Sequence, residues 1–138
     1  TQTFDKTIYL AEENKNLVKN KSQIDENIRE NNFQLVDARG EKRFNGLETE
    51  PRAGLRSGHI QDSLNLPFTM CINRSDNTFK SKQELLKKFQ DLKISKEKNQ
   101  VFTCGSGVTA CILAMANKII NDKNPIIYDG SWSEYGLK

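Results

Sequence analysis

The chain has 138 residues and a net charge of +3, and 36% of its residues are hydrophobic and 28% charged. This length and composition are typical of one folded domain, which excludes collagen-like, low-complexity and disordered proteins. No apolar run approaches the roughly 20 residues that a membrane helix needs, so a membrane-spanning protein is excluded as well.

The first part of the chain predicts a strand, a helix and a second strand after an unpatterned start. Residues 1–14 are weakly patterned, and we interpret them as a linker or edge segment before a domain at residues 15–138. A short strand is expected at residues 16–20, followed by a helix that Ser22 caps. Residues 33–36 form a short apolar run that ends at polar residues, which predicts a buried strand delivering a loop.

The middle of the chain predicts a long loop and a helix. Glycine and proline recur through residues 40–63, so we expect an irregular loop there, and such loops are often functional. A short strand is expected at residues 63–66. Ser81 and Glu84 form a capping box ahead of a helix. The lysines of residues 80–98 do not alternate with aromatic residues, so we expect a solvated face and no nucleic-acid binding.

The last part of the chain continues the alternation of strands and helices. Residues 100–103 and 125–128 are expected as strands, with a buried helix between them. This alternation predicts an α/β fold with a mainly parallel central sheet flanked by helices on both faces. The carboxyl ends of its strands would bring Asp37, Cys104 and Asp129 to one edge, where open α/β sheets bind ligands.

Cys104 is the strongest candidate for a reactive group, the alternative being a small core cysteine. It follows a predicted strand and precedes two glycines and a helix, so backbone N–H groups and the helix dipole would stabilise a thiolate. A cysteine-dependent phosphatase needs an arginine six residues further on, and that residue is Ala110, which argues against phosphatase chemistry. We interpret Cys71 and Cys111 as core cysteines. Three cysteines without C-x-x-C spacing argue against a disulfide scaffold and structural zinc, and favour a reducing compartment.

Several separated motifs resemble one family. They are Val36-Asp37-Ala38-Arg39, Arg43-Phe44-x-Gly46, Glu50-Pro51-Arg52, Gly58-His59-Ile60, Asn65-Leu66-Pro67-Phe68, Cys-Gly-Ser-Gly-Val-Thr at residues 104–109, and Tyr-Asp-Gly-Ser-Trp at residues 128–132. In this order they resemble the rhodanese superfamily, and most closely the catalytic C-terminal half of its two-domain sulfurtransferases. The resemblance implies a rhodanese-like fold and an enzyme that carries sulfur as a persulfide on Cys104.

The loop at residues 104–109 also indicates a substrate. It is similar to the loop of 3-mercaptopyruvate sulfurtransferases, whereas thiosulfate sulfurtransferases carry Cys-Arg-Lys-Gly-Val-Thr. Thiosulfate is a dianion with its charge close to the transferred sulfur, so the neutral Gly105 and Ser106 suit mercaptopyruvate better. The alternatives are a thiosulfate sulfurtransferase and a non-catalytic rhodanese module that binds partners.

The resemblance implies roles for individual residues. Cys104 and Ser106 would be catalytic, and substrate would be bound by Arg43, Arg52, Gly105, Gly107, Val108 and Thr109. Arginine suits the substrate carboxylate because its planar fork can hold both oxygens. We interpret Asp37, Arg39 and Asp129 as structural groups near the site, with Asp129 as the first candidate partner of a buried Arg39. His59 is expected to be structural, and Phe68 and Trp132 to lie in the core.

The resemblance also implies partners and a location. A small-molecule sulfur donor and a thiol acceptor such as thioredoxin are expected, together with cyanide as an alternative acceptor and no metal or organic cofactor. Thr1 as the first residue fits an excised C-terminal domain, whose natural partner would be an N-terminal rhodanese domain that completes the site. We expect a cytoplasmic or mitochondrial protein that binds neither nucleic acid nor membrane.

Overall fold

A five-stranded sheet lies at the centre of the computed structural model, which describes residues 5–94 and 97–138. The strands are β1 (Val18–Lys19), β2 (Phe33–Asp37), β3 (Leu64–Asn65), β4 (Asn99–Thr103) and β5 (Ile126–Tyr128). They lie in the order β1-β5-β4-β2-β3, and every pairing between neighbours is parallel. The predicted parallel α/β sheet is therefore confirmed.

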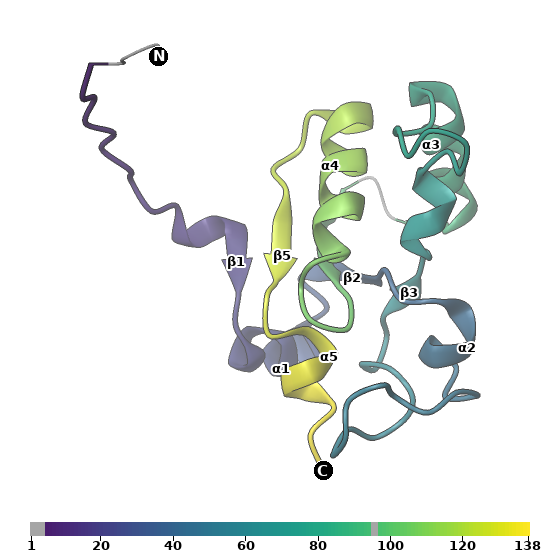
Figure 1. Ribbon diagram of the computed structural model, residues 1–138. Coiled ribbons are helices and arrows are strands. Elements are labelled where there is room, and N and C mark those ends of the chain that lie inside the picture. The colour runs from purple at the N-terminus through teal and green to yellow at the C-terminus, as the bar shows by residue number, and fades with distance from the viewer. Residues whose placement is uncertain (1–4, 95–96) are drawn as a thin grey trace.

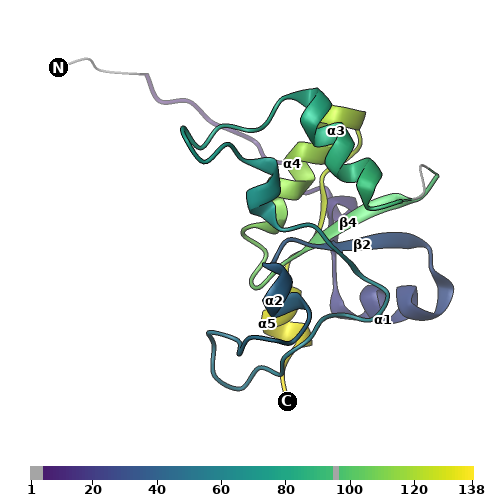
Figure 2. The same cartoon turned by 90° about the vertical axis from the view of Figure 1, so that its right-hand side faces the viewer.

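Helices cover both faces of this sheet. They are α1 (Lys21–Glu30), α2 (Glu41–Phe44), α3 (Lys82–Asp91), α4 (Ala110–Asn121) and α5 (Ser131–Tyr135), with short 3₁₀ turns η1 (Lys15–Leu17) and η2 (Phe68–Cys71). Figure 2 shows α3 and α4 on one side of β2 and β4, and α1 and α5 on the other. The arrangement confirms that the sheet is the middle layer of three.

The strand residues explain why both faces are covered. In β2, Val36 packs into the hydrophobic cluster under α3 and α4, while its neighbour Leu35 packs into the cluster under α1 and α5. In β4, Phe102 and Val101 divide between the two clusters in the same way. Successive side chains of a strand point to opposite faces, so a run of apolar residues must be buried on both.

Helices α1 and α3 each begin with a capping box, and the sequence predicted the cap of only one of them correctly. Ser81 and Glu84 make the predicted capping box of α3: the Glu84 N–H donates to Ser81 Oγ and the Ser81 N–H to Glu84 Oε2. The prediction that Ser22 caps α1 is wrong. Asn20 is the cap, because its Oδ1 accepts the Gln23 N–H at 3.0 Å while Gln23 Oε1 accepts the Asn20 N–H at 3.1 Å.

The irregular loop expected at residues 40–63 is present, and it contains α2 at its start. The end of the chain holds it in place. The Arg56 N–H donates to the Gly136 carbonyl at 2.8 Å, and the Trp132 indole N–H donates to the Arg56 carbonyl at 2.9 Å. These contacts bring the loop against the edge of the sheet where Cys104 lies.

Residues 5–14 have no regular secondary structure and extend away from the sheet (Figure 1). Thr1 and the rest of residues 1–4 lie outside the described residues, as do residues 95–96 of the lysine-rich stretch. The division into a segment at 1–14 and a domain at 15–138 stays a prediction. None of the helices in the described ranges has the length and apolar character to cross a membrane.

Candidate active site

The carboxyl ends of the strands meet at one edge, as parallel pairing requires. Asp37 ends β2, Cys104 directly follows β4 and Asp129 directly follows β5. A cavity of about 380 Å³ opens there. Its lining residues are Arg39, Gly40, Arg43, Pro51, Arg52, Phe68, Cys104, Gly105, Ser106, Val108 and Thr109. The cavity brings together the predicted cysteine, both predicted arginines and most of the predicted loop.

The backbone of Cys104 is held from both sides by the segment that joins β5 to α5. Its N–H donates to Ser131 Oγ at 3.1 Å, and its carbonyl accepts the Trp132 N–H at 2.9 Å. The Ser131 hydroxyl also donates to the Tyr128 carbonyl at 2.8 Å and accepts from Thr103 Oγ1 at 3.2 Å. A hydroxyl has one donor and two acceptor positions, so Ser131 is fully used.

The loop after Cys104 presents unused backbone donors. In the described part of the chain, no group accepts a hydrogen bond from the N–H groups of residues 105–109. These residues immediately precede α4, whose dipole is positive at this end. A thiolate or persulfide at Cys104 would therefore lie beside donors and a positive potential, as the sequence predicts.

Gly107 shapes this loop and does not line the cavity. Its φ is +82°, and a Cβ added to it would lie 2.8 Å from Asp129 Oδ1. Only glycine tolerates both the backbone angle and the close approach. Gly107 is absent from the cavity lining, and its predicted substrate-binding role stays a prediction.

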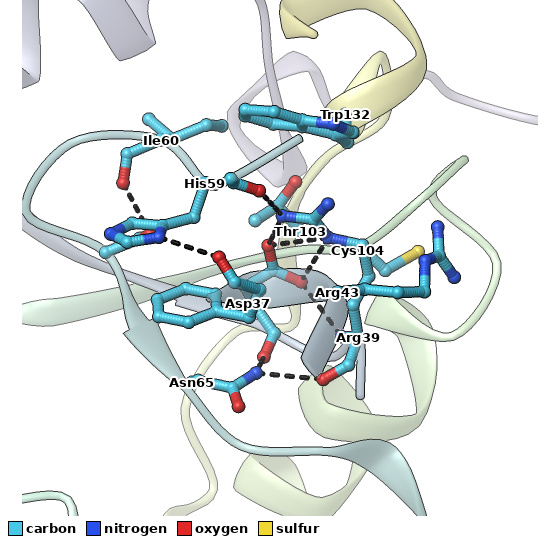
Figure 3. A network of polar contacts seen from close by, with 12 residues as sticks. Asp37, Arg39, Arg43, His59, Ile60, Asn65, Thr103, Cys104 and Trp132 are labelled. Carbon is cyan, nitrogen blue, oxygen red and sulfur yellow. Dashed lines mark hydrogen bonds and ion pairs between the residues drawn. The ribbon is translucent and has the colours of Figure 1, made fainter. Parts of the chain in front are cut away.

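Arg39 is the centre of a buried polar network (Figure 3). Its guanidinium donates to Asp37 Oδ2 from Nη2 at 2.7 Å and from Nε at 3.0 Å, and to Glu50 Oε1 from Nη1 at 2.7 Å. It also lies 4.6 Å from the centre of the Trp132 ring. The arginine is almost fully buried, and two carboxylates offset its charge.

The prediction that Asp129 is the partner of Arg39 is wrong. Asp129 is exposed and lies against Gly107. Asp37 ends β2 and lies two residues before Arg39. Its carboxylate accepts both the Arg39 backbone N–H, at 2.8 Å, and the Arg39 guanidinium, so the pair is local in the chain. Arg39 lines the cavity and Asp37 is paired with it; the structural role assigned to both stays a prediction.

Two more arginines face the loop from the cavity wall. A Cβ added to Gly105 would lie 3.2 Å from Arg43 Nη2 and 3.8 Å from Arg52 Nη1. Figure 3 shows Arg43 and Cys104 on the same side of the buried network, and both line the cavity. The neutral Gly105 therefore leaves room for two guanidinium groups next to the cysteine, and these groups suit an anionic substrate.

The remaining candidates divide between expected and unexpected positions. His59 stacks on Phe44 with ring centroids 3.9 Å apart, and its Nδ1 lies 2.8 Å from the Phe44 carbonyl oxygen, which fits the expected structural histidine. Trp132 is buried as expected. Phe68 is half-buried: it packs on the core and also lines the cavity.

The two other cysteines differ. Cys71 is buried, as predicted, and burial raises the pKa of its thiol to about 11. The prediction that Cys111 faces the interior is wrong, because its side chain is exposed. In α4 the buried residues include Ala110, Leu113 and Ala114, which places position 111 on the outer side of the helix.

Sequence reasoning missed two residues of the site. Glu50 has a side chain only 1% exposed and joins Arg39 to Arg43, and Ser131 holds Cys104. Both lie inside motifs that pointed to the site, Glu50 beside Pro51 and Arg52 and Ser131 beside Trp132. Their position in these motifs was the one sequence feature that could have indicated a role for Glu50 and Ser131 in the site. Their buried polar contacts could not be predicted, because they depend on the folded structure.

The fold and the site define a class of protein: a parallel α/β domain with a cysteine on the loop between a strand and a helix, facing arginines across a cavity. The sequence profile described as "Rhodanese-like domain" matches residues 20–138, and the chain belongs to this family.

Curated and structural relatives agree with this assignment. The chain is 42% identical over 129 residues to the rat thiosulfate sulfurtransferase, covering 93% of this chain and 43% of the relative. It is 40% identical over 137 residues to the Arabidopsis thaliana protein named thiosulfate/3-mercaptopyruvate sulfurtransferase 1, mitochondrial, covering 99% of this chain and 36% of the relative. The crystal structure of SseA from Escherichia coli, described as a 3-mercaptopyruvate sulfotransferase, superposes with a TM-score of 0.74 at 34% identity, covering 92% of this chain and 46% of SseA. The chain thus spans less than half the length of these relatives.

Proposed function

We propose that this domain transfers sulfur from 3-mercaptopyruvate to a thiol or to cyanide through a persulfide on Cys104. The observation that carries the proposal is the cavity in which Cys104 and a neutral Gly105 lie beside Arg43 and Arg52. Mercaptopyruvate has one carboxylate, which two guanidinium groups can hold, and its thiol sulfur can then reach the cysteine. The names of the relatives support sulfur transfer as the reaction class.

In the first step the Cys104 thiolate attacks the thiol sulfur of the substrate. A sulfur–sulfur bond forms and the carbon–sulfur bond breaks, with its electron pair moving to the carbon to give the enolate of pyruvate. The thiol proton stays on the outer sulfur of the persulfide or is lost to solvent, and the enolate takes a proton to become pyruvate. Ser106 would hydrogen-bond the substrate carbonyl or pass on that proton, while the N–H groups of residues 105–109 stabilise the negative sulfur.

In the second step an acceptor thiolate attacks the outer sulfur. The persulfide bond breaks, the acceptor leaves as a persulfide and the Cys104 thiolate is restored. Cyanide would react in the same way to give thiocyanate. Thioredoxin is our candidate protein acceptor, since it supplies a reactive thiolate, and a reducing compartment of the cytoplasm or mitochondria is the location we propose.

We further propose that an N-terminal rhodanese domain packs over this site in the whole protein. The relatives are more than twice as long as the matched region, which leaves room for such a domain. It would exclude water from the cavity and so strengthen the contacts between the arginines and the substrate.

A thiosulfate sulfurtransferase is the second candidate, and the 42% identity to the rat enzyme of that name favours it. The charges of the loop argue the other way, because Gly105 and Ser106 add no positive charge beside the sulfur. A non-catalytic module is the weaker alternative, since Cys104 is present and lies at the cavity.

Mass spectrometry tests the proposal directly. The intact protein is incubated with mercaptopyruvate, its thiols are alkylated, and the mass of the peptide containing Cys104 is measured. We expect a gain of one sulfur atom on this peptide, with pyruvate released in equal amount, and no gain in the Cys104→Ser variant. A gain of sulfur from thiosulfate alone would favour the second candidate, and no gain from either donor would favour the non-catalytic module.

A further inference from the structure

Glu50 joins the buried network to the cavity. Its side chain is 1% exposed and contacts two arginines: Oε1 accepts from Arg39 Nη1 at 2.7 Å, and Oε2 accepts from Arg43 Nη2 at 2.5 Å. Arg43 is 27% exposed, so the pair spans the boundary between the interior and the cavity. A buried carboxylate with two cationic partners cannot move without leaving a charge unpaired.

Within residues 5–94 and 97–138, the contacts of Arg43 leave one part of its guanidinium without a partner. The Glu50 carboxylate accepts hydrogen bonds from Arg43 Nε, at 3.4 Å, and from Arg43 Nη2. The edge of the guanidinium formed by Nε and Nη2, its side edge, is therefore occupied. The opposite edge consists of Nη1 and the second N–H of Nη2. A Cβ on Gly105 would lie 3.2 Å from Nη2 and 4.0 Å from Nη1, so this free edge faces the loop that carries Cys104. It is the edge that can hold a carboxylate with two parallel hydrogen bonds.

Glu50 is itself held by groups that cannot easily rearrange. The Arg39 guanidinium that contacts it is clamped by Asp37 and donates from Nη2 to the Gly58 carbonyl at 2.9 Å. The carboxylates of Asp37 and Glu50 offset the charges of Arg39 and Arg43. The four residues Asp37, Arg39, Arg43 and Glu50 thus form a network of zero net charge, in which the edge of Arg43 formed by Nη1 and Nη2 faces the cavity.

We infer that Glu50 is a positioning residue for substrate recognition. By binding Nε and Nη2 of Arg43, Glu50 orients the guanidinium so that its opposite edge can bind the carboxylate of the sulfur donor. Glu50 itself contacts no substrate atom. The inference rests on the proposed function, because it assumes a donor with a carboxylate.

The test compares two donors that share the reacting group and differ in the carboxylate. These are 3-mercaptopyruvate and mercaptoacetone, which has the same mercapto ketone but a methyl group in place of the carboxylate. Sulfur transfer to a thiol acceptor is measured in the intact protein for the wild type, Glu50→Gln, Glu50→Asp and Glu48→Gln. Glu48 is the matched control, because it lies in the same loop with a side chain 50% exposed and a long, 3.9 Å ion pair to Lys42.

For Glu50→Gln we expect the KM for mercaptopyruvate to rise about tenfold or more. This is the effect of losing one well-aligned, charge-assisted contact between Arg43 and the substrate carboxylate. Turnover at saturation should change less, and the specificity constant for mercaptoacetone should stay within about twofold of the wild type. Glu48→Gln should match the wild type with both donors. If circular dichroism shows that Glu50→Gln does not fold, Glu50→Asp replaces it, since the charge is kept and the shorter side chain draws Arg43 away from the loop.

The coupling between the two residues provides the decisive outcome. In an Arg43→Ala background the Glu50 substitution should have no further effect on the ratio of the two specificity constants. An equal loss of both donors, or an undiminished effect without Arg43, would show that Glu50 acts only on folding or elsewhere and would overturn the inference. If the wild type accepts no sulfur from mercaptopyruvate, the proposed function and the inference both fail; a wild type that does accept it, with unselective Glu50 variants, removes the inference alone.

Discussion

The amide of Cys104 and the hydroxyl of Ser131 are joined by a 3.1 Å hydrogen bond between residues 27 positions apart in the chain. The same hydroxyl donates to Tyr128 at the end of β5, so it connects the ends of two neighbouring strands at the site. Ser131 has a φ of +50°, a conformation that non-glycine residues rarely adopt. A strained, buried residue at this position points to a role in holding the cysteine loop.

Ser131→Ala should therefore lower both stability and activity. It leaves the Cys104 N–H and the Tyr128 carbonyl without their partner, at a cost of about 1–3 kcal/mol in the free energy of unfolding. Denaturant unfolding and persulfide formation measure the two effects. Ser57→Ala is the control, because its exposed hydroxyl makes a long, 3.5 Å contact to the Glu48 carbonyl. Equal stability of the two variants would contradict the role given to Ser131.

Cys104→Ser should abolish sulfur transfer and leave the fold intact. A hydroxyl fills nearly the same volume as a thiol but is not ionised near neutral pH and cannot carry the transferred sulfur. Steady-state transfer from mercaptopyruvate and thermal unfolding are the measurements. Cys111→Ser should remain active, since Cys111 is exposed on the outer side of α4. Loss of activity in folded Cys111→Ser would show that the nucleophile is assigned to the wrong residue.

Arg52→Ala should weaken the use of mercaptopyruvate with little effect on folding. Arg52 is exposed and lines the cavity, and losing one charge-assisted contact to a carboxylate costs about 1.5–3 kcal/mol, or roughly ten- to a hundredfold in specificity constant. Arg43→Ala should have a similar kinetic effect but also lower the free energy of unfolding, since it removes one partner of the buried Glu50. Kinetics and unfolding of both variants check this difference. Unchanged kinetics in both would mean that the carboxylate is held elsewhere.

Cys71 and Cys111 should differ in their reaction with iodoacetamide. With its pKa raised to about 11 by burial, the Cys71 thiol is deprotonated only as the pH approaches that value, so at pH 8 about one molecule in a thousand carries its thiolate. Peptide mapping by mass spectrometry after a short exposure should find Cys111 modified and Cys71 unmodified. Denaturant should remove the difference, because the unfolded chain exposes both thiols. Rapid modification of Cys71 in the folded protein would contradict its buried position.

The double substitution Gly105→Arg with Ser106→Lys should shift donor preference towards thiosulfate. It adds two positive charges beside the sulfur; at an effective dielectric of about 20, a charge pair 4 Å apart is worth about 4 kcal/mol before desolvation and screening. The new side chain at position 105 also meets Arg43, whose Nη2 lies 3.2 Å from the added Cβ, and displaces the edge that faces the substrate carboxylate. The ratio of the two specificity constants at fixed ionic strength is the measurement. A ratio that does not move in a folded variant would place the selectivity on Arg43, Arg52 or another domain.

The sequence alone predicted the α/β sheet and the position of Cys104. Both follow from local information: the apolar runs of β2 and β4 are short and flanked by helical patterns, and the glycines that shape the cysteine loop are its neighbours in the chain. The argument against phosphatase chemistry is equally local, because it depends only on alanine in place of arginine at position 110.

Tertiary structure decided which charged groups meet. The sequence offers several acids as partners for Arg39, and only the folded loop shows that Glu50 is buried against it while Asp129 is exposed. Such pairs depend on the path of a long irregular loop, which no periodic pattern specifies. Cys111 shows the same limit on a smaller scale, because a neighbour in a helix is turned by about 100° and one position separates the buried Ala110 from an exposed thiol.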